Sequence, residues 1–245
     1  MRQSKNPPWP RCCARPQTGW FPRLSETGGP FDPLNQPYGA TPVNEDDREF
    51  LLPPHQQIET MAELNALEAA NIARGMLWVR EQGFAWTDLV DQYTLREVHR
   101  EMFGDVWAWA GKIRQRETTV GIDPAYIQGD WKARLDDAEF HINARTWSPV
   151  ETVLRLHHQT VAIHPFVNGN GRFARLAADE LLAALGLHPD PLDWGVHLAR
   201  TKEQRRTAYL EALRALDMNR NNVDGLVTFA LDPNAVDEWP SSLPS

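Results

Sequence analysis

The chain has 245 residues, of which 42% are hydrophobic, which is enough for one substantial globular domain with a buried core. Its formal net charge of −8 argues against a general nucleic-acid binder, because such proteins usually present a broad basic surface. No apolar run is long enough to cross a membrane, and the start of the chain lacks the apolar region of a signal peptide. The cysteines Cys12 and Cys13 are adjacent and leave no disulfide framework or cysteine metal site, as suits a cytoplasmic protein.

Residues 1–40 form a proline-rich stretch that is predicted to be a disordered tail. Its prolines and the pair Gly28-Gly29 interrupt any strand-like or helix-like period. The tail could be a docking peptide, although an extension without a role of its own is the simpler interpretation. Residues 41–59 are acidic and are stopped by Pro53-Pro54, which suits a short helix or a solvated linker.

From residue 60 onward, apolar periodicity and capping residues predict a series of helices. Thr60 and Glu63 form a capping box at the start of the first helix, and Thr94 with Glu97 offers a second one. Ser148 is expected to cap the helix that follows it. The expected helical segments cover residues 60–82, 86–103, 130–145, 149–162, 172–185, 201–216 and 223–231.

One segment has the composition of β structure. Residues 113–122 end in a β-branched run from Thr118 to Ile122 that Gly121 interrupts, which favours a hairpin. The sequence therefore predicts an all-α domain with one hairpin over residues 60–232. Residues 233–245 are expected to be a C-terminal tail.

Large aromatic residues and most histidines are interpreted as structural. Trp107, Trp109 and Trp131 are expected to anchor the core, and His99 has no partner at metal-binding spacing. The adjacent pair His157-His158 would point about 100° apart on a helix, so the two rings do not share a metal easily. None of these residues is expected to react.

The run from His164 to Arg175, HPFVNGNGRFAR, joins two strongly apolar helical patterns. Its glycines allow several N–H groups to point toward one spot, and the helix that follows adds its own free N–H groups. Arg172 and Arg175 lie three residues apart and can bind several phosphate oxygens. His164, at the other side of the turn, could take a proton from an attacking hydroxyl if its pKa is near the ordinary value.

These residues resemble the signature of the Fic domain family, His-Pro-Phe-x-(Asp/Glu)-Gly-Asn-Gly-Arg-x-x-Arg. The chain from about Gly39 onward is also similar to the Fic proteins called mobile mystery protein B, on the segments Gly39-Ala40-Thr41-Pro42, Ala62-Glu63-Leu64-Asn65, Met102–Trp107 and Trp109-Ala110-Gly111. The resemblance implies a Fic-type helical fold with a β-hairpin flap. It also implies transfer of AMP from ATP to a Tyr, Thr or Ser hydroxyl of a target protein, and a possible helix-turn-helix partner.

The resemblance implies a role for each motif residue. His164 would be the general base, and the loop N–H groups with the two arginines would hold the phosphates of ATP. The flap residues Thr119, Val120 and Gly121 would align an extended target segment by strand addition, for which an ordinary loop hairpin is an equally good interpretation. The residues expected to bind phosphate are Gly169, Asn170, Gly171, Arg172 and Arg175.

Asn168 stands where the family usually has an acid that binds Mg²⁺. An amide oxygen can coordinate magnesium but brings no charge, so a weaker metal site is expected. Three other activities stay open: transfer of another phosphate-containing group, removal of AMP, and nucleotide binding by a regulator with little turnover.

The acidic segment could also restrain the site. Many Fic proteins carry an inhibitory helix whose Glu pairs with the second motif arginine, here Arg175. Glu45 and Glu49 are the two candidates for that role, and a solvated linker is the alternative.

Overall fold

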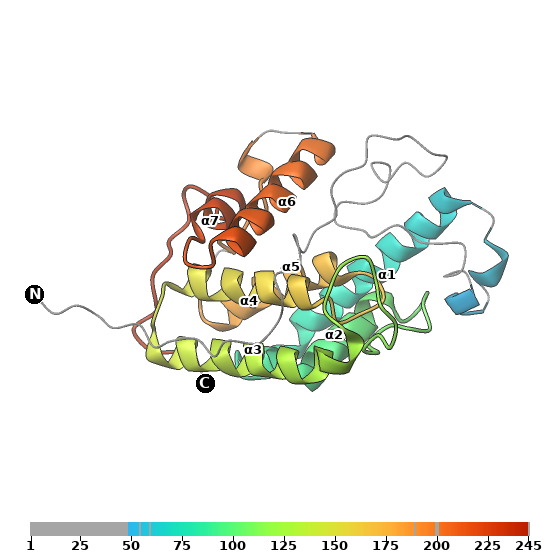
Figure 1. Cartoon of the computed structure of the whole chain (residues 1–245), viewed down its shortest axis with the longest axis horizontal. Helices are drawn as coiled ribbons and strands as arrows, with labels where there is room; N and C mark the ends of the chain where they lie inside the picture. The colour runs from blue at the N-terminus through green and yellow to red at the C-terminus, as the bar shows by residue number, and fades with distance from the viewer. Residues whose placement is uncertain (1–48, 54, 59, 189, 199–200, 245) are drawn as a thin grey trace, which may run out of the picture.

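The structure is a computed structural model that describes residues 49–53, 55–58, 60–188, 190–198 and 201–244. The predicted tail over residues 1–40 and most of the acidic segment lie outside the described residues. Within the described ranges the chain is helical and forms no regular strand, so the all-α prediction is confirmed (Figure 1). The α-helices are α1 (Met61–Gln82), α2 (Gln92–Phe103), α3 (Pro124–Ala144), α4 (Pro149–Ile163), α5 (Asn170–Ala184), α6 (Lys202–Met218) and α7 (Asp224–Ala230), with 3-10 turns η3 (His55–Gln57), η4 (Asp88–Val90) and η5 (Val196–Leu198).

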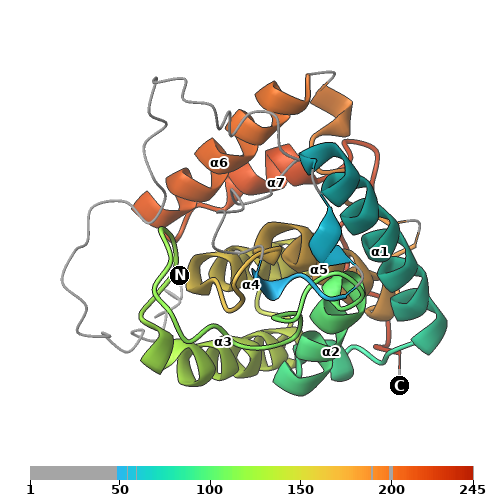
Figure 2. The ribbon, with the colours of Figure 1, turned by 90° about the vertical axis from the view of Figure 1, so that its right-hand side faces the viewer.

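Helices α4 and α5 run through the middle of the molecule. Helix α3 covers them on one side and α6 with α7 on the opposite side, while α1 and α2 pack together at one end (Figures 1 and 2). Helix α4 is buried on most of its sides, because it contacts α3, α5 and α7. No helix in the described part of the chain is long and apolar enough to cross a membrane.

Capping side chains decide where α2 and α3 begin, and both starting points differ from the prediction. Helix α2 starts after Asp91, whose carboxylate accepts the N–H groups of Tyr93 and Thr94, so the expected Thr94–Glu97 capping box is wrong. Helix α3 starts at Pro124 rather than near residue 130, because Asp123 caps it and proline suits the first turn. The predicted capping box at the start of α1 is present.

The predicted hairpin at residues 113–122 is not seen. The segment has bends but no strand ladder, and the isolated bridges found among the described residues are Leu51 with Trp107 and Leu192 with Leu231. The N–H of Arg114 bonds instead to the carbonyl of Pro165 in the turn after α4, and the N–H of Ile122 bonds to the carbonyl of Ile163 at the end of α4. Backbone groups used in this way cannot pair with each other across a hairpin.

Residues 233–244, predicted as a tail, are irregular but packed against the domain. The Asp237 carboxylate accepts hydrogen bonds from the Ser148 hydroxyl at 2.6 Å and from the Val150 N–H at 2.9 Å. The indole N–H of Trp239 donates to the carbonyl of Trp147 at 2.7 Å. The end of the described chain therefore helps to cap the first turn of α4.

The contact between α1 and α2 depends on a glycine. Gly75 lies so close to α2 that a Cβ there would come within 2.7 Å of the Met102 Cα and 2.8 Å of the Glu101 carbonyl. Asn71, one turn earlier, donates to the Glu101 carbonyl at 2.9 Å and accepts the Asp105 N–H at 3.0 Å. A small residue and a buried amide together fix the distance between the two helices.

Gly75→Ala and Gly129→Ala form a matched pair that tests this packing. Alanine favours a helix interior by up to about 1 kcal/mol over glycine, and a Cβ at Gly129 in α3 meets nothing within 4 Å. We expect Gly129→Ala to stabilise the protein by that amount. We expect Gly75→Ala to destabilise it by about 1–3 kcal/mol, because the new methyl group meets backbone that cannot move aside. Urea unfolding of both variants measures the difference, and a stabilised Gly75→Ala would contradict the close approach.

Candidate active site

The turn between α4 and α5 holds His164 in an unusual conformation. His164 caps the end of α4 with φ 56°, in the left-handed region that non-glycine residues seldom adopt. Its side chain is buried, and neither ring nitrogen makes a hydrogen bond of good geometry among the described residues, although the backbone of Val161 lies near enough to raise the pKa of the ring. A buried imidazole without a side-chain partner is available to a ligand that enters the site.

Burial, with a smaller contribution from the positive charge of Arg114, lowers the pKa of His164 to about 4. The expectation of a near-ordinary pKa is therefore wrong. The sequence could not show it, because the cause is the removal of water from the ring. At neutral pH the ring is uncharged and can accept a proton.

The rest of the turn is fixed by the side chain of Asn170. Its amide oxygen accepts the N–H of Phe166 and its amide nitrogen donates to the carbonyl of the same residue, both at 2.9 Å. Asn170 was expected to bind phosphate through its backbone N–H, and its side chain ties the loop to itself. Its backbone N–H, with those of Gly171 and Arg172, belongs to the first turn of α5, where N–H groups have no partner within the helix. Free N–H groups at the start of a helix favour the binding of an anion.

Gly169 and Asn168 complete the turn. Gly169 has φ 79°, and a Cβ there would lie 2.5 Å from the ring of Phe103, so no larger residue fits. Asn168 is buried, and its side-chain oxygen accepts the Gly169 N–H at 2.7 Å. That N–H, expected to contact phosphate, is therefore engaged within the loop.

His99 holds the motif loop against the rest of the domain. Its Nδ1 accepts the Gly111 N–H at 3.0 Å and its Nε2 donates to the Asn168 carbonyl at 3.1 Å. The ring stacks on Phe166 with centroids 3.6 Å apart. Burial lowers the pKa of His99 to about 3, which keeps the ring neutral, as this pair of bonds requires. The prediction of a structural histidine is confirmed, but its link to the site was not visible in the sequence.

Arg172 is paired with a glutamate that the sequence analysis did not single out. Its Nη1 lies 3.2 Å from a carboxylate oxygen of Glu68 on α1, and the indole N–H of Trp107 donates to the other oxygen at 2.6 Å. Burial lowers the pKa of Arg172, and Glu68 opposes this. The Nε and Nη2 atoms of Arg172 have no hydrogen-bond partner within the described residues, so these donors remain for an anion. The sequence feature that could have revealed this partner is a single glutamate, Glu68, on the apolar face of the first helix.

Arg175 lies on the side of α5 that faces α6. Its guanidinium carbon is 5.5 Å from the ring centroid of Tyr209, whose hydroxyl is 2.9 Å from Nε2 of His157. His158 pairs with Asp217 instead, so the two adjacent histidines have separate partners. The structure thus brings Arg172 and Arg175 to one end of α5, each beside a different helix.

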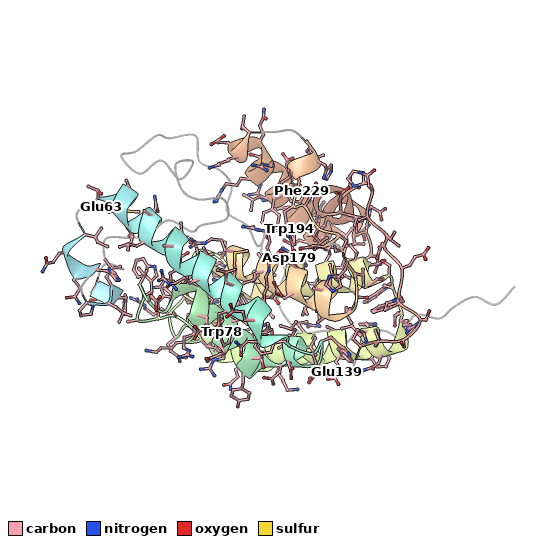
Figure 3. All side chains as sticks on the ribbon, turned by 180° about the vertical axis from the view of Figure 1, so that it is seen from behind. Glu63, Trp78, Glu139, Asp179, Trp194 and Phe229 are labelled. Carbon is pink, nitrogen blue, oxygen red and sulfur yellow. The ribbon has the colours of Figure 1, made fainter. Side chains whose placement is uncertain are left out.

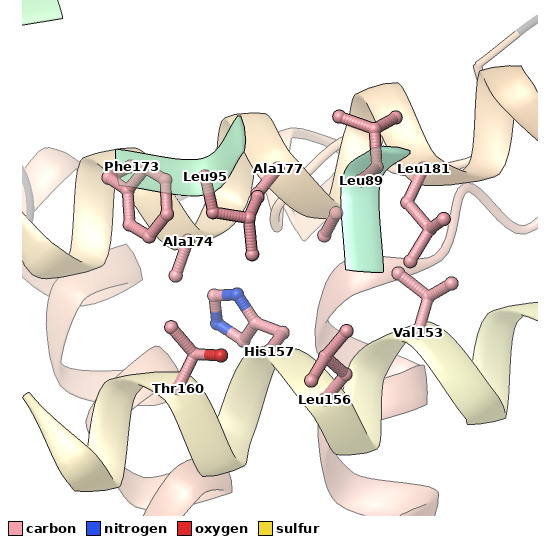
Figure 4. A pocket seen from close by; sticks show the side chains of 11 residues that line it. Leu89, Leu95, Val153, Leu156, His157, Thr160, Phe173, Ala174, Ala177 and Leu181 are labelled. Atoms are coloured by element: carbon pink, nitrogen blue, oxygen red, sulfur yellow. The ribbon is translucent and has the colours of Figure 1, made fainter. Parts of the chain in front are cut away.

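A small cavity lies in the core behind the motif. Figure 4 shows His157 and Thr160 of α4 facing Phe173 and Ala174 of α5 across it. The remaining lining is almost wholly apolar, and it includes Leu95. The cavity belongs to the packing of α4 on α5 and is distinct from the first turn of α5.

The remaining residues that were expected to take part in function do not all lie at the motif turn. Glu49 is exposed, and Glu45 lies outside the described residues. Of the expected flap residues, Thr119 is exposed, whereas Gly121 approaches the motif: a Cβ there would lie 2.7 Å from the His164 Cβ. Glu68 is the glutamate that is seen to pair with Arg172 in the described part of the chain.

Three buried histidines give the protein a specific dependence of stability on pH. Burial lowers the pKa values of His99, His157 and His164 to about 3, 3 and 4, from 6.5. Between pH 6.5 and 4 the unfolded chain therefore binds more protons, and the free energy of unfolding falls as pH falls, by about 1.4 kcal/mol per pH unit for each histidine. Asp179 acts in the opposite direction, because burial raises its pKa to about 8 and the folded form keeps its proton.

His157→Gln tests this dependence. We expect the plot of unfolding free energy against pH to be flatter in this variant, by about 1.4 kcal/mol per pH unit below pH 6, because one proton-binding difference is lost. The exposed His188→Gln is the control, and its slope should match that of the original protein. Urea unfolding at several pH values measures both. Parallel lines for all three proteins would contradict a neutral, buried His157.

Comparison with known proteins agrees with this geometry. Residues 89–182 match the model of the Fic/DOC family. "Probable protein adenylyltransferase Fic" of Escherichia coli (strain K12) is 27% identical over 172 residues, which cover 66% of this chain and 79% of that protein. "Protein adenylyltransferase fic-1" of Caenorhabditis elegans is 32% identical over 98 residues, which cover 38% of this chain and 19% of that protein. The chain thus spans most of the bacterial relative but only a small part of the nematode one.

The fold is shared with solved Fic structures. The BepC protein of Bartonella tribocorum matches with a TM-score of 0.55 and 15% sequence identity, over 76% of this chain and 96% of that one. The matched residues 89–182 run from η4 to α5 and include the whole motif turn. The family match and the Fic-named relatives together show that residues 89–182 form a Fic/DOC family domain.

Proposed function

We propose that this protein transfers AMP from ATP to the hydroxyl of a Tyr, Thr or Ser side chain of a target protein. The observation that carries the proposal is the neutral imidazole of His164, which has no side-chain partner, beside the first turn of α5, where Arg172 has unused donors. The relatives named protein adenylyltransferase support the reaction, and the BepC structure holds AMPPNP, an ATP analogue.

In this reaction the target hydroxyl oxygen attacks the α-phosphorus of ATP. His164 accepts the hydroxyl proton, the new oxygen–phosphorus bond forms, and the bond to the leaving pyrophosphate breaks. The N–H groups of Asn170 and Gly171 receive the charge that develops on the phosphate oxygens. Arg172 and Arg175 hold the outer phosphates and keep the chain in line for attack.

Magnesium would be held mainly by the phosphate oxygens. The protein offers the amide oxygen of Asn168, and the described residues contain no group of three or more acidic, histidine or cysteine side chains that could hold a metal. This donor set fits a cation that keeps water and phosphate ligands. Magnesium would neutralise charge on the departing pyrophosphate.

The flap segment is the proposed docking site for the target. Gly121 lies close to His164, and Thr119 in the same segment is exposed, which supports the proposal. An extended target segment could bond to backbone groups of this stretch by strand addition. The restraint of the site by Glu45 or Glu49 stays a prediction, tested by whether Glu49→Gly raises the activity.

Incubation with ATP labelled at the α-phosphate, host lysate and magnesium tests the proposed reaction. AMP transfer predicts a labelled protein band from α-labelled ATP and none from γ-labelled ATP. Labelling from γ alone would indicate phosphorylation. Binding of ATP without labelling would indicate a regulator, and release of AMP from a modified protein would indicate the reverse reaction.

His164→Ala should lower transfer by about 10²–10⁴-fold while ATP binding is kept, because the variant loses only the proton acceptor. His164→Asn is the matched variant, since asparagine tolerates left-handed backbone and is not a base. Both are compared with the original protein in the same labelling assay, after circular dichroism has shown that they are folded. Transfer at the original rate in either variant would rule out His164 as the base.

Asn168→Asp should lower the magnesium concentration that gives half-maximal transfer. One carboxylate oxygen can keep the bond to the Gly169 N–H, while the other adds a full charge toward the cation. Asn143→Asp adds the same charge on the exposed side of α3 and serves as the control. Magnesium titrations of transfer and of ATP binding measure the effect. Superimposed curves for Asn168→Asp and the original protein would show that this side chain does not face the metal.

A further inference from the structure

A buried arginine outside the motif joins the flap segment to the turn that carries the base. Arg114 is only 2% exposed. Its Nε donates to the carbonyl of His164 at 2.7 Å, and its Nη1 donates to the carbonyl of Arg116 at 2.9 Å. Its Nη2 donates to the carbonyls of Ile122 and, at 3.4 Å, Ile163. One guanidinium thus bonds to both ends of the segment and to the turn.

Backbone bonds reinforce this contact on either side of His164. The Arg114 N–H donates to the carbonyl of Pro165 at 3.0 Å, and the Ile122 N–H donates to the carbonyl of Ile163 at 3.4 Å. Gly121 packs between them, where a Cβ would lie 2.6 Å from Nη2 of Arg114 and 2.7 Å from the His164 Cβ. The segment is therefore clamped around the one residue that the reaction uses as a base.

Only arginine can make this set of contacts. Its guanidinium has five N–H donors in a planar fork, whereas lysine has a single ammonium group. A buried charge is costly unless it is well bonded, and here the direct partners are carbonyl oxygens, with Asp123 and Glu117 contributing favourable charge from nearby. A plain structural loop would not need a buried cation, so the cost points to a role in the site.

We propose that Arg114 is a positioning residue, which keeps His164 in its left-handed conformation and holds the flap segment against it. The inference rests on the proposed transfer reaction. A base must lie within hydrogen-bond reach of the proton that it accepts, and a shift of about 1 Å can cost about 10²-fold in rate. Arg114 contacts neither the first turn of α5 nor the motif arginines in the hydrogen bonds described above, so nucleotide binding should not depend on it.

Arg114→Lys tests the proposal, with the exposed Arg116→Lys in the same segment as matched control. We expect Arg114→Lys to lower kcat about 10²-fold and to leave the KM for ATP nearly unchanged, because lysine keeps the charge and loses the fork. Arg116→Lys should behave as the original protein. An unchanged kcat in Arg114→Lys would overturn the proposal, as would a raised KM for ATP at unchanged kcat.

Gly121→Ala is the second variant, and it decides the question if Arg114→Lys does not fold. It leaves the guanidinium in place but forces a methyl group between Arg114 and His164. We expect the same loss of kcat, and an original kcat in this folded variant would overturn the proposal.

A measurement without turnover separates this inference from the proposed function. If the original protein transfers no AMP, the proposed function fails, but the ring of His164 can still be titrated by NMR. Release of the flap segment would expose the ring, so the pKa of His164 should rise from about 4 toward 6.5 in Arg114→Lys and stay in place in Arg116→Lys. An unmoved titration in a folded Arg114→Lys would overturn the positioning role.

Discussion

The structure depends on one constraint: the chain must turn tightly between α4 and α5. The turn places His164 in left-handed backbone, which costs of order 1 kcal/mol or more for a residue other than glycine. Bonds from every side offset that cost. Asn170 ties the loop to itself, His99 ties it to α2, and Arg114 ties it to the flap segment. The N–H groups in the first turn of α5 are left without a partner in the helix, which is the property that an anion site requires.

The polar groups around the motif are matched by helices that come from distant parts of the chain. Glu68 on α1 meets Arg172, and Tyr209 on α6 meets Arg175, so each motif arginine is oriented by a different helix. A buried ion pair is weak evidence for stability, because the desolvation of both partners offsets most of their attraction. The ion pair instead fixes the orientation of the two side chains, because the hydrogen bond from Trp107 holds Glu68 in one orientation toward Arg172. Phosphate oxygens would then find the remaining donors of Arg172 already in place.

A site built in this way reduces stability at low pH. The rings of His99, His157 and His164 stay neutral because burial excludes water from them, and the same exclusion of water surrounds the reacting groups. The carboxyl of Asp179 on α5 accepts a hydrogen bond from the indole of Trp194 (Figure 3). Its contribution to the free energy of unfolding changes with pH in the opposite direction, which reduces the net loss of stability at low pH. Function and stability are therefore coupled through burial at the centre of the fold.

The helical class, most helix ranges and the motif could be predicted from the amino-acid sequence, because these follow from local periodicity, capping residues and the chemistry of twelve consecutive positions. The predicted bounds of α1 and α4 are almost correct to the residue, since Thr60 and Ser148 cap their starts through neighbours three positions away. Other features arise from contacts between distant segments. The expected hairpin failed because Arg114 and Ile122 pair with the end of α4 and the turn after it, 51 and 41 residues further along, which no local pattern shows. The low pKa of His164 and the partner of Arg172 were likewise hidden, because burial and contacts between α1 and α5 arise only when the helices pack.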